Sequence, residues 1–260
     1  MRKFDLQSVN ETAYGFRSKL LFFVENIEKL RTALGKERDE MRILDVACGN
    51  GTQVTIPLGS EGYDVLGVDF HEPSIEYARG ENPFKNVNFI LKDVEKLETE
   101  LHGQRFDAII FSDMLEHVEG PQALLKAVRP LLAPNGILLI SIPNGYGPFE
   151  VENFILRKLG IIRLGRYVRN IIKNKPQTPY NVENGHVQFF TRKSFDELLK
   201  GAGFEAVDFK NGCFFGGSIS NAIISKISFL TRVNIKIAKY LPSQLCSAWY
   251  FVCRLKNYEH

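Results

Sequence analysis

Short apolar runs alternate with helical patterns over most of the chain. The pattern predicts strands at 42–47, 63–69, 87–92, 106–112 and 136–142, and helices at 52–59, 73–80 and 121–132. Residues 12–35 also have helical spacing and end near Gly35, and the tail 248–256 is typical of a strand that pairs with 204–210. Strands that alternate with helices favour an α/β fold, with a mainly parallel sheet covered by helices on both faces.

We expect one domain over residues 1–260. It would comprise an N-terminal helical lid at 1–40, a ligand-binding core at 41–144, a basic helical insertion at 145–185, and a C-terminal part at 186–260 with a second basic insertion at 212–246. Hydrophobic residues make up 44% of the chain and charged residues 24%, which is typical of a globular protein.

Targeting and cysteine signals are weak. We expect neither a signal peptide at the charged N-terminus nor a transmembrane helix, because no uncharged run is long enough. Cys48, Cys213, Cys246 and Cys253 form no C-x-x-C pair, so we expect no zinc site and no disulfide framework. A cytoplasmic location fits best.

A glycine-bracketed turn follows the first predicted strand. Gly49 and Gly51 let the backbone approach a ligand, and the next helix presents free N–H groups to it. Asp69 closes the second predicted strand, where an acid can accept both hydroxyls of a ribose. The pattern predicts a nucleotide-type site. A dinucleotide fingerprint needs a third small residue where this chain has Val54, so an NAD-dependent oxidoreductase is the disfavoured alternative.

The pattern D-x-x-x-G-x-G on Asp45, Gly49 and Gly51 resembles the first motif of the class I S-adenosylmethionine (SAM) methyltransferases, with Ala47 in place of one family glycine. Segments at 86–94, 106–118, 132–144 and 185–203 resemble later motifs of the same family, in the same order. The resemblance implies a Rossmann-like, doubly wound sheet of seven strands. The last strand would be antiparallel and inserted between strands five and six.

The resemblance also implies a site for SAM. Gly49 and Gly51, with Asp45 and Ala47 in the same motif, would hold the methionine part, and Asp69 the ribose. The predicted adenine contacts are Phe70, Asp93 and Val94, and the residues that border the methyl group are Ser112 and Asp113.

Two histidines are candidates for acid–base chemistry. His186 is the predicted general base because its ordinary pKa suits proton removal near neutral pH, and His117 is the next candidate. Asp113, Glu116 and His117 form D-x-x-E-H, which resembles the E-x-x-E-H that some ubiquinone-biosynthesis O-methyltransferases use for a divalent ion. The same segment also occurs in family members without metal, and we assign no metal here. A structural, hydrogen-bonded histidine is the alternative for His186.

Positive charge is concentrated outside these motifs. Residues 151–185 hold seven Lys or Arg against two Glu, and residues 214–260 hold six against one. In the first segment, Arg163, Arg166, Arg169 and Lys173 oppose an apolar face. In the second, Ile219 to Ile237 form an apolar stripe opposed by Arg232, Lys236 and Lys239. Such helices favour contact with an anionic membrane surface or a lipid-linked acceptor, although packing on one face alone also explains them. Nucleic acid is disfavoured because aromatic residues are not interleaved with the charges.

The sequence therefore predicts SAM-dependent methyl transfer to a small-molecule, lipid-linked or glycan acceptor, at oxygen. The protein would be cytoplasmic with peripheral contact at the inner face of the membrane. A non-catalytic SAM-binding or membrane-associated protein is the second alternative.

Overall fold

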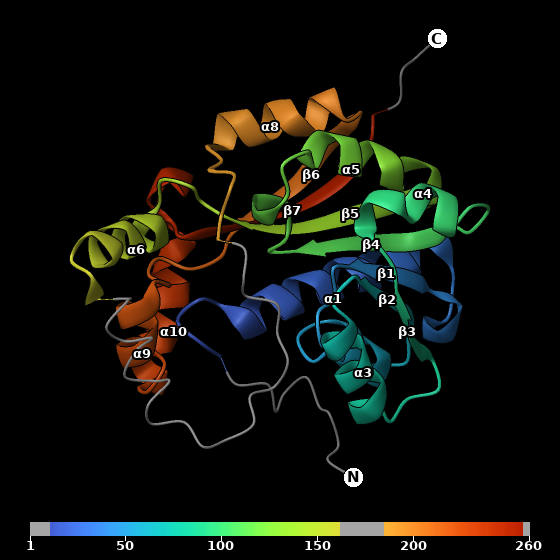
Figure 1. The fold of residues 1–260 in the computed structure, drawn as a ribbon, viewed down its shortest axis with the longest axis horizontal. Coiled ribbons are helices and arrows are strands. Elements are labelled where there is room, and N and C mark those ends of the chain that lie inside the picture. Colours follow the sequence, from blue (N-terminus) through green and yellow to red (C-terminus); the bar gives the residue numbers. More distant parts are fainter. Residues whose placement is uncertain (1–10, 162–184, 257–260) are drawn as a thin grey trace.

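The structure is a computed structural model that describes residues 11–161 and 185–256. The strands of this part form one sheet in the order β3-β2-β1-β4-β5-β7-β6 (Figure 1). The strands are β1 (Arg42–Val46), β2 (Asp64–Asp69), β3 (Val87–Leu91), β4 (Phe106–Ser112), β5 (Leu132–Pro143), β6 (Phe204–Asn211) and β7 (Ala248–Leu255). β7 runs antiparallel to both β5 and β6, and the other neighbours are parallel. This confirms the predicted doubly wound sheet.

Helices cover both faces of the sheet (Figure 1). One core lies under α4, α5 and α8, and the other lies under α1, α2 and α3. The helices are α1 (Phe16–Leu34), α2 (Thr55–Ser60), α3 (Glu72–Glu81), α4 (Leu97–Glu100), α5 (Pro121–Val128), α6 (Pro148–Lys158), α8 (Arg192–Gly201), α9 (Ser218–Ile224) and α10 (Ser228–Ala238). Short 3-10 turns include η3 (Val94–Lys96) and η4 (Leu115–His117). Among the described residues, no helix combines the length and apolar character of a membrane span.

The fifth strand begins earlier than the sequence predicts. Pro134 to Gly136 has the composition of a turn, but this segment lies inside β5, where the register against β4 shifts between Phe106 and Ala108. Asn135 has a φ of 63°, and a Cβ on Gly136 would lie 2.9 Å from the carbonyl oxygen of Asp107. The turn residues therefore form an irregularity within the strand instead of a turn that precedes it.

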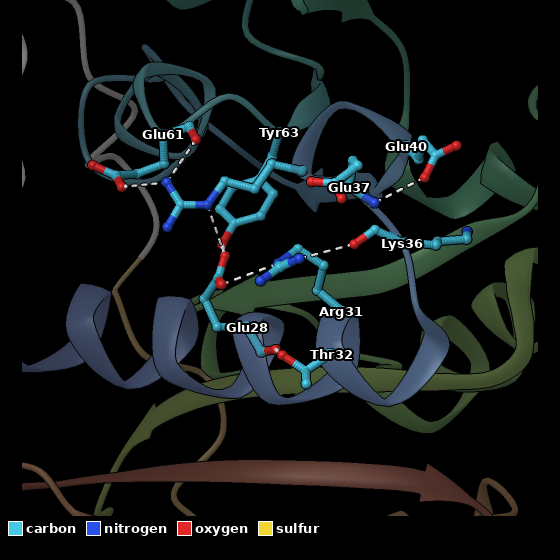
Figure 2. A network of polar contacts seen from close by, with 9 residues as sticks. Glu28, Arg31, Thr32, Lys36, Glu37, Glu40, Glu61 and Tyr63 are labelled. Atoms are coloured by element: carbon cyan, nitrogen blue, oxygen red, sulfur yellow. Dashed lines mark hydrogen bonds and ion pairs between the residues drawn. The ribbon is translucent and has the colours of Figure 1, made fainter.

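A polar network fixes α1 against the start of β2. Glu28 on α1 accepts hydrogen bonds from the Tyr63 hydroxyl and from Arg38, whose guanidinium also contacts Glu61 (Figure 2). Gly35 ends the helix in the left-handed region, at a φ of 64°, as its position predicts. α1 also buries apolar residues against the sheet, so it is part of the core as well as a neighbour of the loops at the sheet edge.

The two basic insertions are described to different extents. The first, predicted at 145–185, contains α6, and its predicted face with Arg163, Arg166, Arg169 and Lys173 lies outside the described residues. The second is not one amphipathic helix but two, α9 and α10, and most of its predicted apolar stripe is exposed.

Candidate functional site

The loop after β1 has the backbone that its glycines predict. Ala47, Gly49 and Gly51 have φ angles of 58°, 55° and 70°, in the left-handed region that favours glycine. A Cβ on Gly51 would also lie 2.5 Å from the ring of Phe89. Gly51 is therefore required both by its φ and by its packing, whereas Ala47 adopts a costly conformation at the position where the family has glycine.

Asp69, at the carboxyl end of β2, faces this loop. One carboxylate oxygen accepts the Gly49 N–H at 2.7 Å, and the other accepts the His71 N–H at 2.8 Å. A carboxylate offers about four acceptor positions, so two remain for the hydroxyl groups of a ligand. This geometry fits the predicted ribose contact and also makes Asp69 a support of the loop.

Asp45 lies below the loop and is almost fully buried. It accepts a hydrogen bond from the Thr55 hydroxyl at 2.6 Å, which joins the end of β1 to the start of α2. Burial raises the pKa of Asp45 to about 7.

The predicted adenine contacts follow β2 and β3. Phe70 is 54% exposed directly after Asp69, so its ring is accessible to a planar ligand. Asp93 is exposed, whereas Val94 is buried in the core under α4 and α5.

Asp113, after Ser112 at the end of β4, is held by three side chains, of which the Tyr14 hydroxyl is the most distant at 3.4 Å. Lys19 on α1 forms an ion pair with it at 2.5 Å, and the Ser141 hydroxyl donates to it at 2.8 Å. Lys19 is only 2% exposed, whereas the Asp113 side chain is 20% exposed, so the cation of this ion pair is buried and the carboxylate is half-buried. The pair brings a cation from α1 to the carboxyl ends of the strands, where the loop and Asp69 also lie.

His186 is brought to this edge by backbone hydrogen bonds. The N–H groups of Val187 and Gln188 donate to the carbonyl oxygen of Glu116, at 2.9 and 3.0 Å. The rings of His186 and His117 then meet edge to face, with centroids 4.9 Å apart. The structure therefore brings together both histidines that the sequence singles out, although they are far apart in the chain.

Glu150, near the start of α6, bonds to Nδ1 of His186. The ring of Phe149 stacks on the imidazole, with centroids 5.8 Å apart and an interplanar angle of 27°. The side chains of His186 and Glu150 are 17% and 11% exposed. Such a carboxylate fixes the orientation of an imidazole and leaves its Nε2 as the free nitrogen.

Glu116, His117 and His186 form a group whose potential ligand atoms all lie within 4.8 Å of one another; we name it the histidine cluster. Glu116 is 1% exposed, and its Oε2 has no hydrogen-bond partner among the described residues. Burial, and then the neighbouring Asp113 carboxylate, raise the pKa of Glu116 well above its usual range. The donor set fits a borderline divalent ion such as Zn²⁺. Asp113, the first acid of the predicted D-x-x-E-H set, is not in this group because it pairs with Lys19.

Two residues of the site were not singled out from the sequence. Lys19 had a usable signal, since it shares the buried face of α1 with Phe22, Phe23 and Asn26 at helical spacing. Glu150 had none, because its contact depends on how α6 leaves the sheet.

Three features define the class of the protein: a glycine loop after β1, an acid after β2, and an antiparallel β7 inserted in an open sheet. Together they are typical of the class I SAM-dependent methyltransferases. The chain belongs to the family described as the methyltransferase domain, whose model matches residues 18–208. The family and fold confirm the class that the sequence predicts, with SAM as its cofactor. Val54, which spoils a dinucleotide fingerprint, is buried in the core next to the loop.

Several relatives carry the name ubiquinone biosynthesis O-methyltransferase. The chain is 31% identical over 122 residues to the one from Rickettsia akari, covering 45% of this chain and 46% of the relative. It is 29% identical over 187 residues to the one from Rickettsia canadensis, covering 71% and 70%. The chain spans about half the length of the first curated relatives it matches.

Solved structures show the same fold. A SAM-dependent methyltransferase from Clostridium acetobutylicum aligns over 96% of this chain and 94% of its own, with a TM-score of 0.58 and 12% identity. A magnesium protoporphyrin IX methyltransferase from Synechocystis, solved with S-adenosylhomocysteine bound, aligns over 94% and 86%, with a TM-score of 0.52 and 16% identity.

Proposed function

We propose that this protein transfers the methyl group of SAM to an oxygen atom of a small-molecule or lipid-linked acceptor. The observation that carries the proposal is the His186–Glu150 pair, which lies beside η4, directly beyond the carboxyl end of β4. The relatives named O-methyltransferases support an oxygen acceptor.

The chain has residues suited to each part of the cofactor. The loop backbone at Gly49 and Gly51, which has no Cβ at either position, would approach the methionine part. The free acceptor positions of Asp69 would take the ribose hydroxyls. Phe70 would stack on the adenine. Lys19 adds a cation that would attract the carboxylate of the methionine part, at the expense of its pair with Asp113. When bound, SAM supplies a methyl group already activated by its sulfonium.

The remaining task is to remove the proton of the acceptor. His186 accepts it at Nε2, because Glu150 occupies Nδ1 and stabilises the imidazolium that forms. The rings of Phe149 and Phe189, with centroids 5.8 and 6.5 Å from that of the imidazole, limit how the ring can turn. If the histidine cluster held a divalent ion, Glu116, His117 and His186 would be its ligands, and the ion would act as a Lewis acid toward the acceptor oxygen.

The proposed location is the cytoplasm, with peripheral contact at the inner face of the membrane. The concentration of Lys and Arg in residues 151–185 and 214–260 supports this, because anionic lipids attract such segments.

The first test is calorimetry of the purified protein with SAM, S-adenosylhomocysteine and NAD. Binding of the first two without NAD is the expected result, and binding of NAD alone would contradict the proposal. Methyl-labelled SAM with a lipid extract then tests activity, and label in a product identified by mass spectrometry names the acceptor. SAM binding without any transfer would leave only a binding function.

The second test concerns the base. His186→Ala should lower turnover at least about 100-fold with unchanged SAM affinity, and Glu150→Gln should lower turnover less, because the histidine remains. Under this assignment, dialysis against EDTA has no effect. A loss of activity that Zn²⁺ restores would instead make the histidine cluster a metal site.

A further inference from the structure

Three helices at one end of the molecule expose large apolar side chains. Figure 1 shows α6, α9 and α10 grouped at the left of the view, beyond the sheet. Among the described residues, 13 of the 21 large apolar side chains that are exposed lie in residues 151–161 and 215–240. They are Val151, Phe154, Ile155, Leu159, Ile161, Phe215, Ile219, Ile223, Ile227, Phe229, Leu230, Ile237 and Tyr240. We name residues 148–161 and 215–240 the helical end.

The exposure is extensive. Phe154 is 58% exposed, Phe229 is 65% exposed and Tyr240 is 80% exposed. Single exposed apolar residues are normal, but a group of this size marks a surface that meets an apolar partner.

The orientation of α10 is fixed by polar contacts on its inner side. The Asn234 amide donates to the carbonyl oxygens of Ala13 and Phe215 at 2.7 and 2.8 Å and accepts the Phe215 N–H at 2.8 Å. Thr231 is also buried and donates to the carbonyl oxygen of Ile224. α9 buries no residue at all. α10 thus buries Thr231 and Asn234 with Ala238, while most of its large apolar residues stay exposed, unlike an ordinary surface helix.

The exposed charged residues of the helical end, residues 148–161 and 215–240, are all cations. Exposed cations are Arg157, Lys158, Lys226, Arg232, Lys236 and Lys239, and none of them forms an ion pair with another described residue. The chain has no Asp or Glu between Asp208 and Glu259. The acids of α6 point to internal partners: Glu150 bonds to His186, and Glu152 accepts the N–H groups of Ile219 and Ser220 at the start of α9.

We infer that the helical end docks on an anionic lipid bilayer, with its apolar side chains in the interface and its cations at the headgroups. Exposed aromatic and aliphatic residues on amphipathic helices, flanked by Lys and Arg, are what such a surface binds. A second copy of the chain fits less well, because a two-fold contact through this surface would set the same cations against each other.

Docking of this surface would present the active site to the membrane. α6 carries both exposed Phe154 and the Glu150 that holds His186, and α10 holds the segment before α1 through Ala13. The relevance of docking to a lipid-linked acceptor rests on the proposed methyl transfer, whereas docking itself does not.

Cosedimentation of the full chain with vesicles tests the inference. At low salt the protein should sediment with vesicles of equal parts phosphatidylglycerol and phosphatidylcholine, and not with pure phosphatidylcholine. High salt should release it. Wild-type protein that stays in the supernatant with the anionic vesicles at low salt would overturn the inference.

Two matched pairs of variants locate the surface. Lys226→Gln/Arg232→Gln/Lys236→Gln/Lys239→Gln should weaken vesicle binding at least about 100-fold, since each cation contributes roughly five-fold near an anionic surface. The control removes three exposed Lys and one Arg elsewhere, as Lys85→Gln/Lys193→Gln/Lys200→Gln/Arg254→Gln. Equal losses in both would mean that only net charge matters and would refute docking by the helical end.

The second pair tests the apolar residues. Ile155→Ser/Phe229→Ser should weaken binding about tenfold or more, and Leu21→Ser/Val207→Ser, at 41% and 49% exposed positions elsewhere, should not. Light scattering of the protein without vesicles measures its oligomeric state and so distinguishes docking on lipid from contact with a second copy. A dimer that Ile155→Ser/Phe229→Ser dissociates, without vesicle binding, would show that a second copy covers this surface. Calorimetry with SAM on every variant separates failure of docking from failure of the proposed function.

Discussion

Asp69→Asn is the substitution that most directly tests the cofactor site. Both oxygens of the Asp69 carboxylate already accept a backbone N–H, from Gly49 and from His71, and the side chain is 4% exposed. Asparagine has nearly the same volume but keeps one oxygen and replaces the other with an NH₂ donor. The variant therefore loses acceptors for the ribose and also places a donor against one backbone donor.

The loss of SAM affinity and the loss of unfolding free energy differ in size and are measured by different assays. Two hydrogen bonds to a charged group are worth roughly 1.5 kcal/mol each, which corresponds to about 100-fold weaker SAM binding by calorimetry. One buried N–H without an acceptor costs about 1–3 kcal/mol of unfolding free energy, measured in urea without SAM. Affinity is measured at a temperature where circular dichroism shows the variant to be folded.

Asp64→Asn is the control on the same strand. Asp64 lies at the opposite end of β2, where its exposed carboxylate is 3.6 Å from Arg42. An exposed pair of this kind contributes about 0–1 kcal/mol, and the residue is remote from the loop, so SAM affinity should not change. A folded Asp69→Asn protein that binds SAM within about three-fold of wild type, against the 100-fold derived from its hydrogen bonds, would refute the ribose assignment.

Two further predictions concern the same loop. Burial raises the pKa of Asp45 to about 7, so the folded state holds its proton more tightly than the unfolded state, whose pKa is about 4. The unfolding free energy should therefore fall as pH rises from about 4 to 7, by at most about 4 kcal/mol. Denaturation of Asp45→Asn, which is neutral throughout, should lack this part of the slope, and a constant offset from wild type at every pH would contradict the assignment. Gly51→Ala combines a φ of 70° with a Cβ 2.5 Å from Phe89, and should lose about 2–4 kcal/mol of unfolding free energy. Gly80→Ala, in α3 with no atom within 4 Å of its Cβ, should be neutral or slightly stabilising; equal losses in the two would show that the packing of the loop is not what requires glycine.

Most of the sheet could be predicted from the sequence, because its signals are local. Each parallel strand is an apolar run that ends at the site edge, and Gly49, Gly51 and Asp69 mark the ends of β1 and β2. The start of β5 could not be predicted, since Asn135 and Gly136 have turn chemistry that the strand absorbs as an irregularity.

The candidate site could be predicted only in part, because its remaining contacts join distant segments. His186 was identified from the chain, but its partner Glu150 was not. The contact depends on two backbone bonds to the Glu116 carbonyl and on the direction in which α6 leaves β5. Neither has a local signature in the sequence.

The second insertion shows what periodicity omits. The spacing of its isoleucines correctly predicts helices. An apolar stripe indicates that one helix face avoids water, but it does not indicate whether the protein's own core or a partner covers that face. In α10 the inner side must satisfy the backbone groups of Ala13 and Phe215, and an asparagine does this where an isoleucine could not. The apolar residues are then left on the outer side, next to Arg232 and Lys236. An apolar face that residues 11–161 and 185–256 leave exposed favours a partner, and the cations beside it favour an anionic one.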